Sequence, residues 1–291
     1  MNSSKTIGIV GCGTMGTGIA IVAARAGFKT RIYDLRPEPL ENARKQAAAF
    51  LKKSVERGKL AAGEDVRIMS QFFTTTEIKD FADCDLVIEA VFEDLKVKHS
   101  IFKQLNDVCH AETIFASNTS TISITEIAGG SGRADRFVGM HFCLPAQLMK
   151  LVEMSPGMNT SEATFDQAWK LCEDLGQRPV RTRDTPGFIL NYFLIPFHND
   201  VINMVDQGVA TPADIDLAVK TALGYPLGPL ELLDMVGMDT QLLLCEAMHG
   251  LTHEPRAACP PLVKRMIGAG RLGRKSGQGF HTYDSNKIFG A

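Results

Sequence analysis

The sequence predicts an α/β fold in which a doubly wound parallel sheet, with a helical-hairpin insertion, is followed by an all-α C-terminal domain. Two observations predict this arrangement. Short apolar runs alternate with helical segments through the first 185 residues, which is typical of a doubly wound sheet. The remaining residues carry long segments of helical apolar period, at 188–206 and 214–223, and almost no strand-like run. The length of 291 residues, at roughly 150 per domain, also predicts about two domains.

The elements follow from apolar runs, composition and glycine or proline punctuation. Short apolar runs predict strands at 6–10, 28–33, 86–90, 114–117 and 137–141, with a further possible strand at 150–154. Helical composition and period predict helices at 19–26, 37–59, from about 62, 95–108, 124–129 and 162–175. The two polar helices form the insertion, at about 38–70. The turn Thr185-Pro186-Gly187 separates the two domains, which we place at 1–185 and 186–291.

Composition excludes several classes of protein. Hydrophobic residues make up 45% and charged residues 22% of the chain, as in an ordinary globular protein. The net charge of −2 indicates neither a nucleic-acid partner nor an anionic membrane. We find no secretory signal, no apolar run near the ~18 to 20 residues that span a bilayer, and no cysteine spacing typical of zinc. The 7 cysteines are expected to be reduced thiols, so we predict a cytoplasmic protein without a metal.

A glycine-rich turn joins the first expected strand to the helix after it. Gly11-Cys12-Gly13-Thr14-Met15-Gly16 fits the pattern GxGxxG, whose glycines allow a tight turn, a close approach of the backbone to a pyrophosphate, and close helix packing. Asp34 ends the next strand, where its carboxylate can accept hydrogen bonds from a ribose and repel the 2′-phosphate of NADP. Arg36 could soften that preference. The pattern predicts a Rossmann-type NAD site formed by Gly11, Gly13, Thr14, Met15, Gly16 and Asp34.

Polar side chains stand at the ends of three further expected strands. His141 ends the run 137–141, and Glu153 ends the next apolar run, 150–153, so both could reach one edge of the sheet as a base with an orienting carboxylate. His141 alone could equally be a structural histidine. The run 117–120, Ser-Asn-Thr-Ser, clusters hydroxyl and amide groups at a third strand end, and it could also serve as the N-cap of the following helix.

Eight sequence blocks carry a resemblance to a known family. They are GCGTMGTGIA, DLVIEAVFED, ASNTSTISITEIA, GMHF, MKLVE, DTPGFILN, GYPLGPLELLD and GRKSGQGF. In this order, over about residues 5–284, they resemble the short-chain L-3-hydroxyacyl-CoA dehydrogenase family, which includes bacterial 3-hydroxybutyryl-CoA dehydrogenases. The resemblance implies NAD-dependent oxidation of an L-3-hydroxyacyl-CoA to the 3-ketoacyl-CoA, or the reverse reduction, in fatty acid metabolism. It also implies a homodimer, which the long apolar helices after residue 188 favour independently.

The resemblance further implies roles for single residues. His141 would be the general base that takes the substrate hydroxyl proton, and Glu153 would orient its imidazole. The residues that hydrogen-bond the substrate oxygen and thioester region would be Ser120 and Asn191. Those near the nicotinamide and its ribose would be Glu93, Lys98, Asn118 or Ser120, and Lys275. Cations of the insertion would hold the phosphates of coenzyme A, although they could also be an ordinary solvated face: Lys53, Arg57 and Lys59.

Two positions depart from the family's usual sequence. The family block HFFNP is His141-Phe142-Cys143-Leu144-Pro145 here, so an apolar side chain, Leu144, replaces an amide. Tyr192 follows Asn191, where members commonly carry arginine. Because both positions belong to the expected site, two alternatives stay open: an NAD-dependent dehydrogenase of a hydroxy acid that carries no coenzyme A, and an NAD-binding relative that is impaired in turnover.

Overall fold

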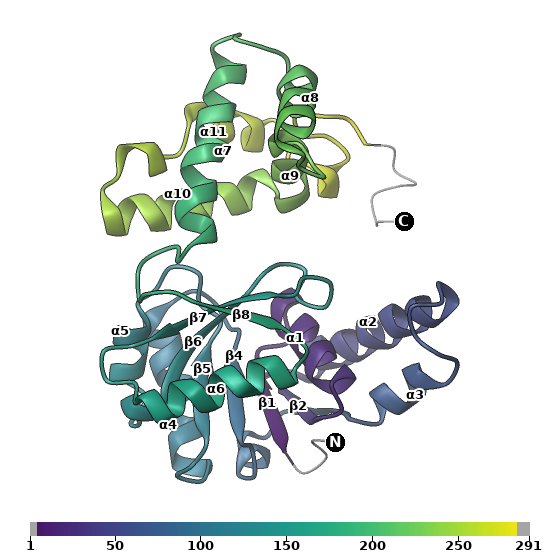
Figure 1. Cartoon of the computed structure of the whole chain (residues 1–291), viewed down its shortest axis with the longest axis vertical. Helices are drawn as coiled ribbons and strands as arrows, with labels where there is room; N and C mark the ends of the chain where they lie inside the picture. The colour runs from purple at the N-terminus through teal and green to yellow at the C-terminus, as the bar shows by residue number, and fades with distance from the viewer. Residues whose placement is uncertain (1–4, 284–291) are drawn as a thin grey trace. The chain divides into compact units, whose positions relative to one another are not determined.

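The computed structural model describes residues 5–283 (Figure 1), and the chain divides between Thr185 and Pro186 into two compact units. The first unit is built on one eight-stranded sheet with the order β3-β2-β1-β4-β5-β6-β7-β8. Its strands are β1 (Thr6–Val10), β2 (Lys29–Tyr33), β3 (Phe72–Thr75), β4 (Leu86–Glu89), β5 (Ile114–Ser117), β6 (Phe137–Phe142), β7 (Leu151–Pro156) and β8 (Arg178–Arg181).

Helices connect these strands. They are α1 (Thr14–Arg25), α2 (Pro37–Glu56), α3 (Glu64–Met69), α4 (Leu95–Val108), α5 (Ile124–Gly129) and α6 (Glu162–Asp174), with short 3-10 helices at Ile78–Phe81 and Ala134–Arg136. The pair α2 and α3 pack on each other and form the connection from β2 to β3. Figure 1 shows α1 beside β1 and β2, whereas α6 lies against β6, β7 and β8.

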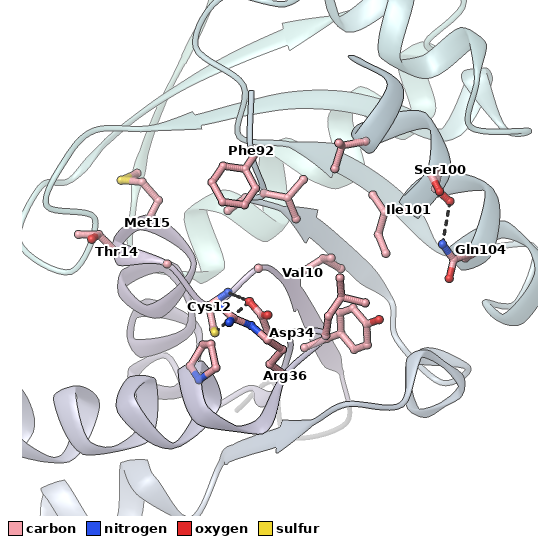
Figure 2. A pocket seen from close by; sticks show the side chains of 18 of the residues that line it. Val10, Cys12, Thr14, Met15, Asp34, Arg36, Phe92, Ser100, Ile101 and Gln104 are labelled. Carbon is pink, nitrogen blue, oxygen red and sulfur yellow. Dashed lines mark hydrogen bonds between the residues drawn. The ribbon is translucent and has the colours of Figure 1, made fainter. Parts of the chain in front are cut away.

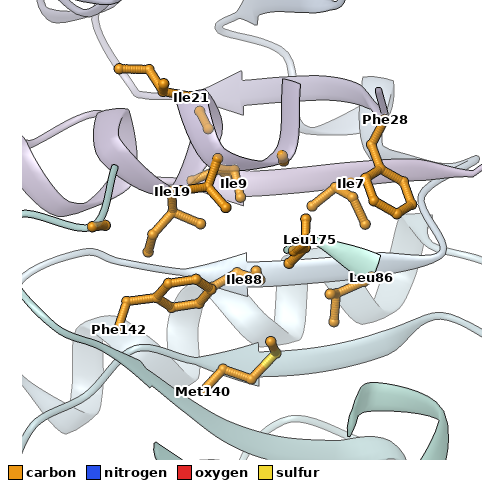
Figure 3. Close-up of a cluster of buried hydrophobic side chains, with 14 of the residues drawn as sticks. Ile7, Ile9, Ile19, Ile21, Phe28, Leu86, Ile88, Met140, Phe142 and Leu175 are labelled. Carbon is orange, nitrogen blue, oxygen red and sulfur yellow. The ribbon is translucent and has the colours of Figure 1, made fainter. Parts of the chain in front are cut away.

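The two faces of the sheet differ in chemistry. Successive side chains of a strand point to opposite faces, and one face is apolar where it packs against α1 and α6. Figure 3 shows side chains of that cluster: Ile7, Ile9, Ile19, Ile21, Phe28, Leu86, Ile88, Met140, Phe142 and Leu175. The other face packs against α4, where the Phe102 ring contacts the rings of Phe115 and Phe137 at centroid distances of 5.4 and 4.7 Å. Polar side chains occupy the end of this second face.

The second unit is helical. Its helices are α7 (Leu190–Asp206), α8 (Pro212–Leu223), α9 (Pro229–Val236), α10 (Met238–Thr252) and α11 (Pro261–Gly268), with short 3-10 helices at Pro255–Ala257 and Arg274–Ser276. Its own core joins these helices through Ile202, Leu230, Leu233, Met238 and Val263. No helix within residues 5–283 is both long and apolar enough to span a bilayer.

The predicted fold class is confirmed, with three corrections to the sheet. The two edge strands of the sheet, β3 and β8, were not predicted from the sequence. In β8, Pro179 removes a backbone donor, which an edge strand tolerates. The sheet is also not wholly parallel, because β7 runs antiparallel to β6. Only residues 143–150 connect them, whereas a parallel crossover needs about a dozen residues or more.

Candidate active site

A cavity of about 790 Å³ opens at the carboxyl ends of β1, β2 and β4. The strand order reverses between β1 and β4, and ligands of open α/β sheets bind at such a switch point. Figure 2 shows part of the lining, with Phe92 and Ile101 on one side and Cys12, Asp34 and Arg36 on the other. The lining includes five of the residues that the sequence assigns to the cofactor: Gly11, Gly13, Thr14, Met15 and Asp34.

The three glycines of the turn serve different purposes. Gly11 has a φ of +94°, and a Cβ there would lie 2.6 Å from the Ala90 carbonyl oxygen. A Cβ at Gly16 would lie 1.8 Å from the Gly11 carbonyl oxygen, so the helix can pack against the turn only without a side chain. A Cβ at Gly13 would meet nothing within 4 Å. Gly13 therefore faces open space at the start of α1, where backbone N–H groups and the helix dipole favour a phosphate.

Asp34 is held by the turn that it faces. Its Oδ2 accepts hydrogen bonds from the backbone N and the Sγ of Cys12, at 3.2 and 3.1 Å. Burial, together with the Asp34 carboxylate, raises the pKa of Cys12 to about 12, so the thiol keeps its proton and donates. The carboxylate stands at the rim of the cavity as an acceptor, which fits a ribose hydroxyl. The residues present therefore fit an NAD molecule.

A second set of polar side chains lies at the end of the sheet face that packs against α4. Glu89 of β4 is paired in register with Ser117 of β5, and His141 of β6 is paired with Glu153 of β7. The neighbours of these residues along each strand point to the apolar face, so all four share the opposite face. The antiparallel direction of β7 brings Glu153, near the start of its strand, opposite His141 near the end of β6.

His141 forms hydrogen bonds through both ring nitrogens. Its Nδ1 lies 2.7 Å from Glu153 Oε2, and its Nε2 lies 3.1 Å from Ser120 Oγ. Glu153 is fully buried and His141 nearly so. Nδ1 faces the carboxylate and Nε2 faces the Ser120 hydroxyl, so one ring nitrogen can donate to Glu153 while the other accepts from Ser120. The structure brings together the base, the orienting carboxylate and the hydroxyl that the family resemblance implies.

Glu93 and Lys98 form an ion pair next to Ser120. The Lys98 ammonium is buried between two carboxylates, 2.7 Å from Glu89 Oε1 and 3.2 Å from Glu93 Oε2. Glu93 also accepts hydrogen bonds from Thr119 Oγ1 and from the backbone N of Ser120. Burial opposes the charge of Glu93, but Lys98 and these hydrogen bonds outweigh it and hold the pKa of Glu93 below its usual range. Glu93 is therefore an anion fixed beside Ser120.

The remaining predicted site residues lie in three other places. Asn118 Oδ1 accepts from the backbone N of Phe142 at 2.9 Å, which ties the end of β5 to the end of β6. The basic residues of the insertion are exposed, with Lys53 in the last turn of α2 and two in the turn that follows: Arg57 and Lys59. Two residues belong to the second unit, Asn191 in α7 and Lys275, which forms an ion pair with Asp239. Leu144 and Tyr192, where the sequence departs from the family, are both exposed.

Sequence reasoning missed Glu89 and the contribution of Cys12. A usable signal for Glu89 was present, because a buried strand that ends in an acid at the ligand-binding edge of a sheet requires a partner for that charge. Nothing in the sequence indicated the hydrogen bonds from Cys12 to Asp34, because they depend on the side-chain orientation of Asp34. Within residues 5–283, no group of three or more His, Cys, Asp or Glu side chains is arranged to hold a metal ion.

Comparisons with known proteins agree over nearly the whole chain. The sequence-family model for the NAD binding domain of 3-hydroxyacyl-CoA dehydrogenase matches residues 6–185, and the family model for the C-terminal domain matches residues 187–283. A probable 3-hydroxybutyryl-CoA dehydrogenase of Deinococcus radiodurans is 42% identical over 276 residues, which cover 95% of this chain and 99% of that protein. The mitochondrial hydroxyacyl-coenzyme A dehydrogenase of Homo sapiens is 38% identical, with 96% and 91% covered.

A solved structure gives the same result. The (S)-3-hydroxybutyryl-CoA dehydrogenase of Ralstonia eutropha superimposes with a TM-score of 0.90 at 36% identity, and the match covers 97% of this chain and 100% of that one. The family resemblance of the eight sequence blocks is thereby confirmed. The chain belongs to the NAD-binding 3-hydroxyacyl-CoA dehydrogenase family.

Proposed function

We propose that this protein oxidises an L-3-hydroxyacyl-CoA to the 3-ketoacyl-CoA with NAD, or catalyses the reverse reduction, with His141 as general base. The observation that carries the proposal is the buried His141–Glu153 pair, in which His141 Nε2 lies 3.1 Å from Ser120 Oγ. Oxidation of an alcohol releases a proton as well as a hydride, so it needs a base at the hydroxyl. The family relatives named above act on substrates of this class.

In this proposal, His141 Nε2 takes the hydroxyl proton while Ser120 Oγ holds the reacting oxygen in place. The imidazole becomes a cation in that step. Glu153, which is buried against Nδ1, stabilises the positive charge and fixes the ring orientation. NAD supplies the hydride acceptor when it is bound. The turn Gly11 to Gly16 and Asp34 would hold the phosphates and the adenosine ribose, and Glu93 with Lys98 would lie near the nicotinamide ribose.

Other residues enter the proposal through the family resemblance. Asn191 would contact the thioester region of the substrate, and Asn118 and Lys275 would contact the cofactor. The exposed cations of the insertion would bind the phosphates of coenzyme A, so the KM for acyl-CoA should rise with salt: Lys53, Arg57 and Lys59. The alternative for these cations, a solvated surface, predicts no such salt dependence.

We also propose a homodimer and a cytoplasmic location. Among the described residues, more than half of the exposed large apolar side chains lie in the second unit, which is the smaller one. Exposed apolar side chains are typical of interfaces. Those on α8 and α10 include Leu217, Leu223, Leu243 and Leu251. The cysteines are free thiols, which is typical of a reducing compartment.

The function is tested by steady-state reduction of acetoacetyl-CoA and longer 3-ketoacyl-CoA substrates with NADH and NADPH. We expect turnover with NADH, and a kcat/KM at least about tenfold lower with NADPH, because Asp34 repels the 2′-phosphate. Free acetoacetate is the matched control without coenzyme A. Turnover only of acids that lack coenzyme A would favour the first alternative. Binding of NAD without turnover of any substrate would favour a relative that is impaired in turnover. The first variant to test would then be Leu144→Asn.

A further inference from the structure

Glu89 is a buried carboxylate for which the proposed reaction has no direct use. It is the last residue of β4 and is 0% exposed. Its Oε1 accepts from Lys98 Nζ and from the backbone N of Val91, both at 2.7 Å, and its Oε2 accepts from Ser117 Oγ at 2.6 Å. A buried carboxylate is costly unless its charge is paired and its oxygens accept hydrogen bonds. Both oxygens of Glu89 meet this requirement.

Two of the three contacts of Glu89 lead toward Ser120, each by a different route. One route passes through Lys98, whose ammonium is shared with Glu93, and Glu93 in turn accepts from the backbone N of Ser120 at 2.9 Å. The other route passes through Ser117, whose Oγ accepts from the backbone N of Thr119 at 3.2 Å. Thr119 Oγ1 then donates to Glu93 at 2.6 Å, which closes a ring of hydrogen bonds.

Glu89 and Glu93 share the ammonium of Lys98, and this sharing sets the orientation of the Glu93 carboxylate. The Lys98 side chain is 1% exposed, whereas the Glu93 side chain is 37% exposed. With Glu89 in place, Lys98 is drawn toward β4, and Glu93 keeps its Oε1 for the segment 119–121. Without the charge of Glu89, Lys98 would pair with Glu93 alone and pull its carboxylate inward, away from that segment.

We propose that Glu89 is a positioning residue that holds the Ser120 hydroxyl against His141, acting through Lys98 and Ser117. The inference rests on the proposed function, because it assigns Ser120 and His141 to the reaction. Glu89 itself touches neither. The competing explanation is that Glu89 only fastens β4 to α4 and contributes to stability.

A double-mutant cycle on kcat separates the two explanations, using Glu89→Gln, Ser120→Ala and the double variant. Residues that act through one another give non-additive effects, whereas independent residues give additive ones. We expect Glu89→Gln to lower kcat about tenfold to a hundredfold in the wild-type background, and less than about threefold in the Ser120→Ala background. Equal losses in the two backgrounds would overturn the proposal.

Amide hydrogen exchange without cofactor or substrate gives a readout that is independent of turnover. Glu89→Gln should speed exchange at residues 119–121, whose amides depend on Ser117 and Glu93. The matched control is Thr113→Val, which removes a buried hydrogen bond of 2.7 Å to the Cys84 carbonyl just before β5 begins, far along the strand from Ser117. The control should lower thermal stability but leave exchange at 119–121 and kcat within about twofold. The same exchange pattern in both variants would contradict the proposal.

Ser117→Ala keeps the inference testable if Glu89→Gln does not fold. It removes one hydroxyl and leaves the Glu89–Lys98 ion pair intact. We expect a smaller loss of kcat, about threefold to tenfold, that again nearly disappears on Ser120→Ala. A wild-type protein without turnover would count against the proposed function, whereas an active wild type with additive cycles would count against Glu89 alone.

Discussion

The two units of this protein each contain a buried histidine, and the two differ in what surrounds the ring. His141 is 8% exposed and lies in β6, where Glu153 and Ser120 engage its two nitrogens. His198 is 4% exposed and lies within α7. Its Nε2 has no hydrogen-bond partner among residues 5–283. Burial lowers the pKa of His198 to about 4, and a hydrogen bond with Gln241 opposes this only in part.

The difference lies in the group that each buried ring would face if it took up a proton. An imidazolium in a buried site needs a counter-charge, which Glu153 provides for His141. His198 has Gln241, a neutral amide, in that position. A base this weak is neutral at physiological pH, and the transfer of a proton to it from an alcohol is unfavourable. We therefore propose His141, and not His198, as the base of the reaction.

The largest expected effect comes from replacing each histidine in turn. His141→Gln should lower kcat for 3-ketoacyl-CoA reduction by about 10²- to 10⁴-fold, because the general acid–base group is lost. His198→Gln should leave kcat at pH 7 within about threefold. Steady-state kinetics on the two purified variants, with circular dichroism to confirm folding, checks both. A comparable loss of kcat in both variants would break the distinction between them.

The next effect is on stability and concerns His198 alone. Its folded pKa of about 4 lies below the ordinary value of 6.5, so between these values the unfolded state binds a proton that the folded state rejects. The free energy of unfolding should therefore fall as the pH drops from 7 to 4, by about 3 kcal/mol from this group. Urea unfolding at several pH values, compared with His198→Gln, isolates the contribution.

The variant His198→Gln should lose that part of the pH dependence, since an amide does not titrate in this range. His110→Gln is the control, because it removes an imidazole that is exposed. Its unfolding free energy should follow that of the wild type across the pH range. Parallel curves for the wild type and His198→Gln would show that His198 does not resist protonation in the folded state.

The sequence predicted the cofactor half of the site more completely than the catalytic half. The first strand, the glycine turn and Asp34 form one local unit, so their chemistry could be inferred from spacing. The catalytic half depends on the ends of β4, β5, β6 and β7, which lie side by side only after the sheet has formed. Periodicity predicted α4 and α5 residue for residue. The edge strands β3 and β8 lack the fully buried runs that revealed β4 and β5, which are equally short.

The antiparallel turn from β6 to β7 is a particular case. The sequence suggested that His141 and Glu153 could share an edge, and it treated them as the ends of two apolar runs. In the structure Glu153 lies early in β7, and it faces His141 because β7 reverses direction. The acid at the end of β4 indicated that Glu89 needs a partner, but the sequence did not show that this partner is Lys98, nine residues later and on a helix. Side-chain networks of this kind are set by tertiary packing, which local patterns do not encode.

The smallest effect is expected for Glu153→Gln, which removes the carboxylate charge beside His141 that His198 lacks. Glu153→Gln keeps the shape of the side chain and an oxygen that can accept from Nδ1, but it gives the imidazolium no counter-charge. We expect kcat to fall about tenfold to a hundredfold, equivalent to about 1.4 to 2.8 kcal/mol in the barrier. The dissociation constant for NAD, measured by calorimetry, should stay within about twofold, because Glu153 does not line the dinucleotide cavity. If kcat were unchanged, a neutral partner such as that of His198 would suffice for catalysis, and the contrast between the two histidines would lose its chemical basis.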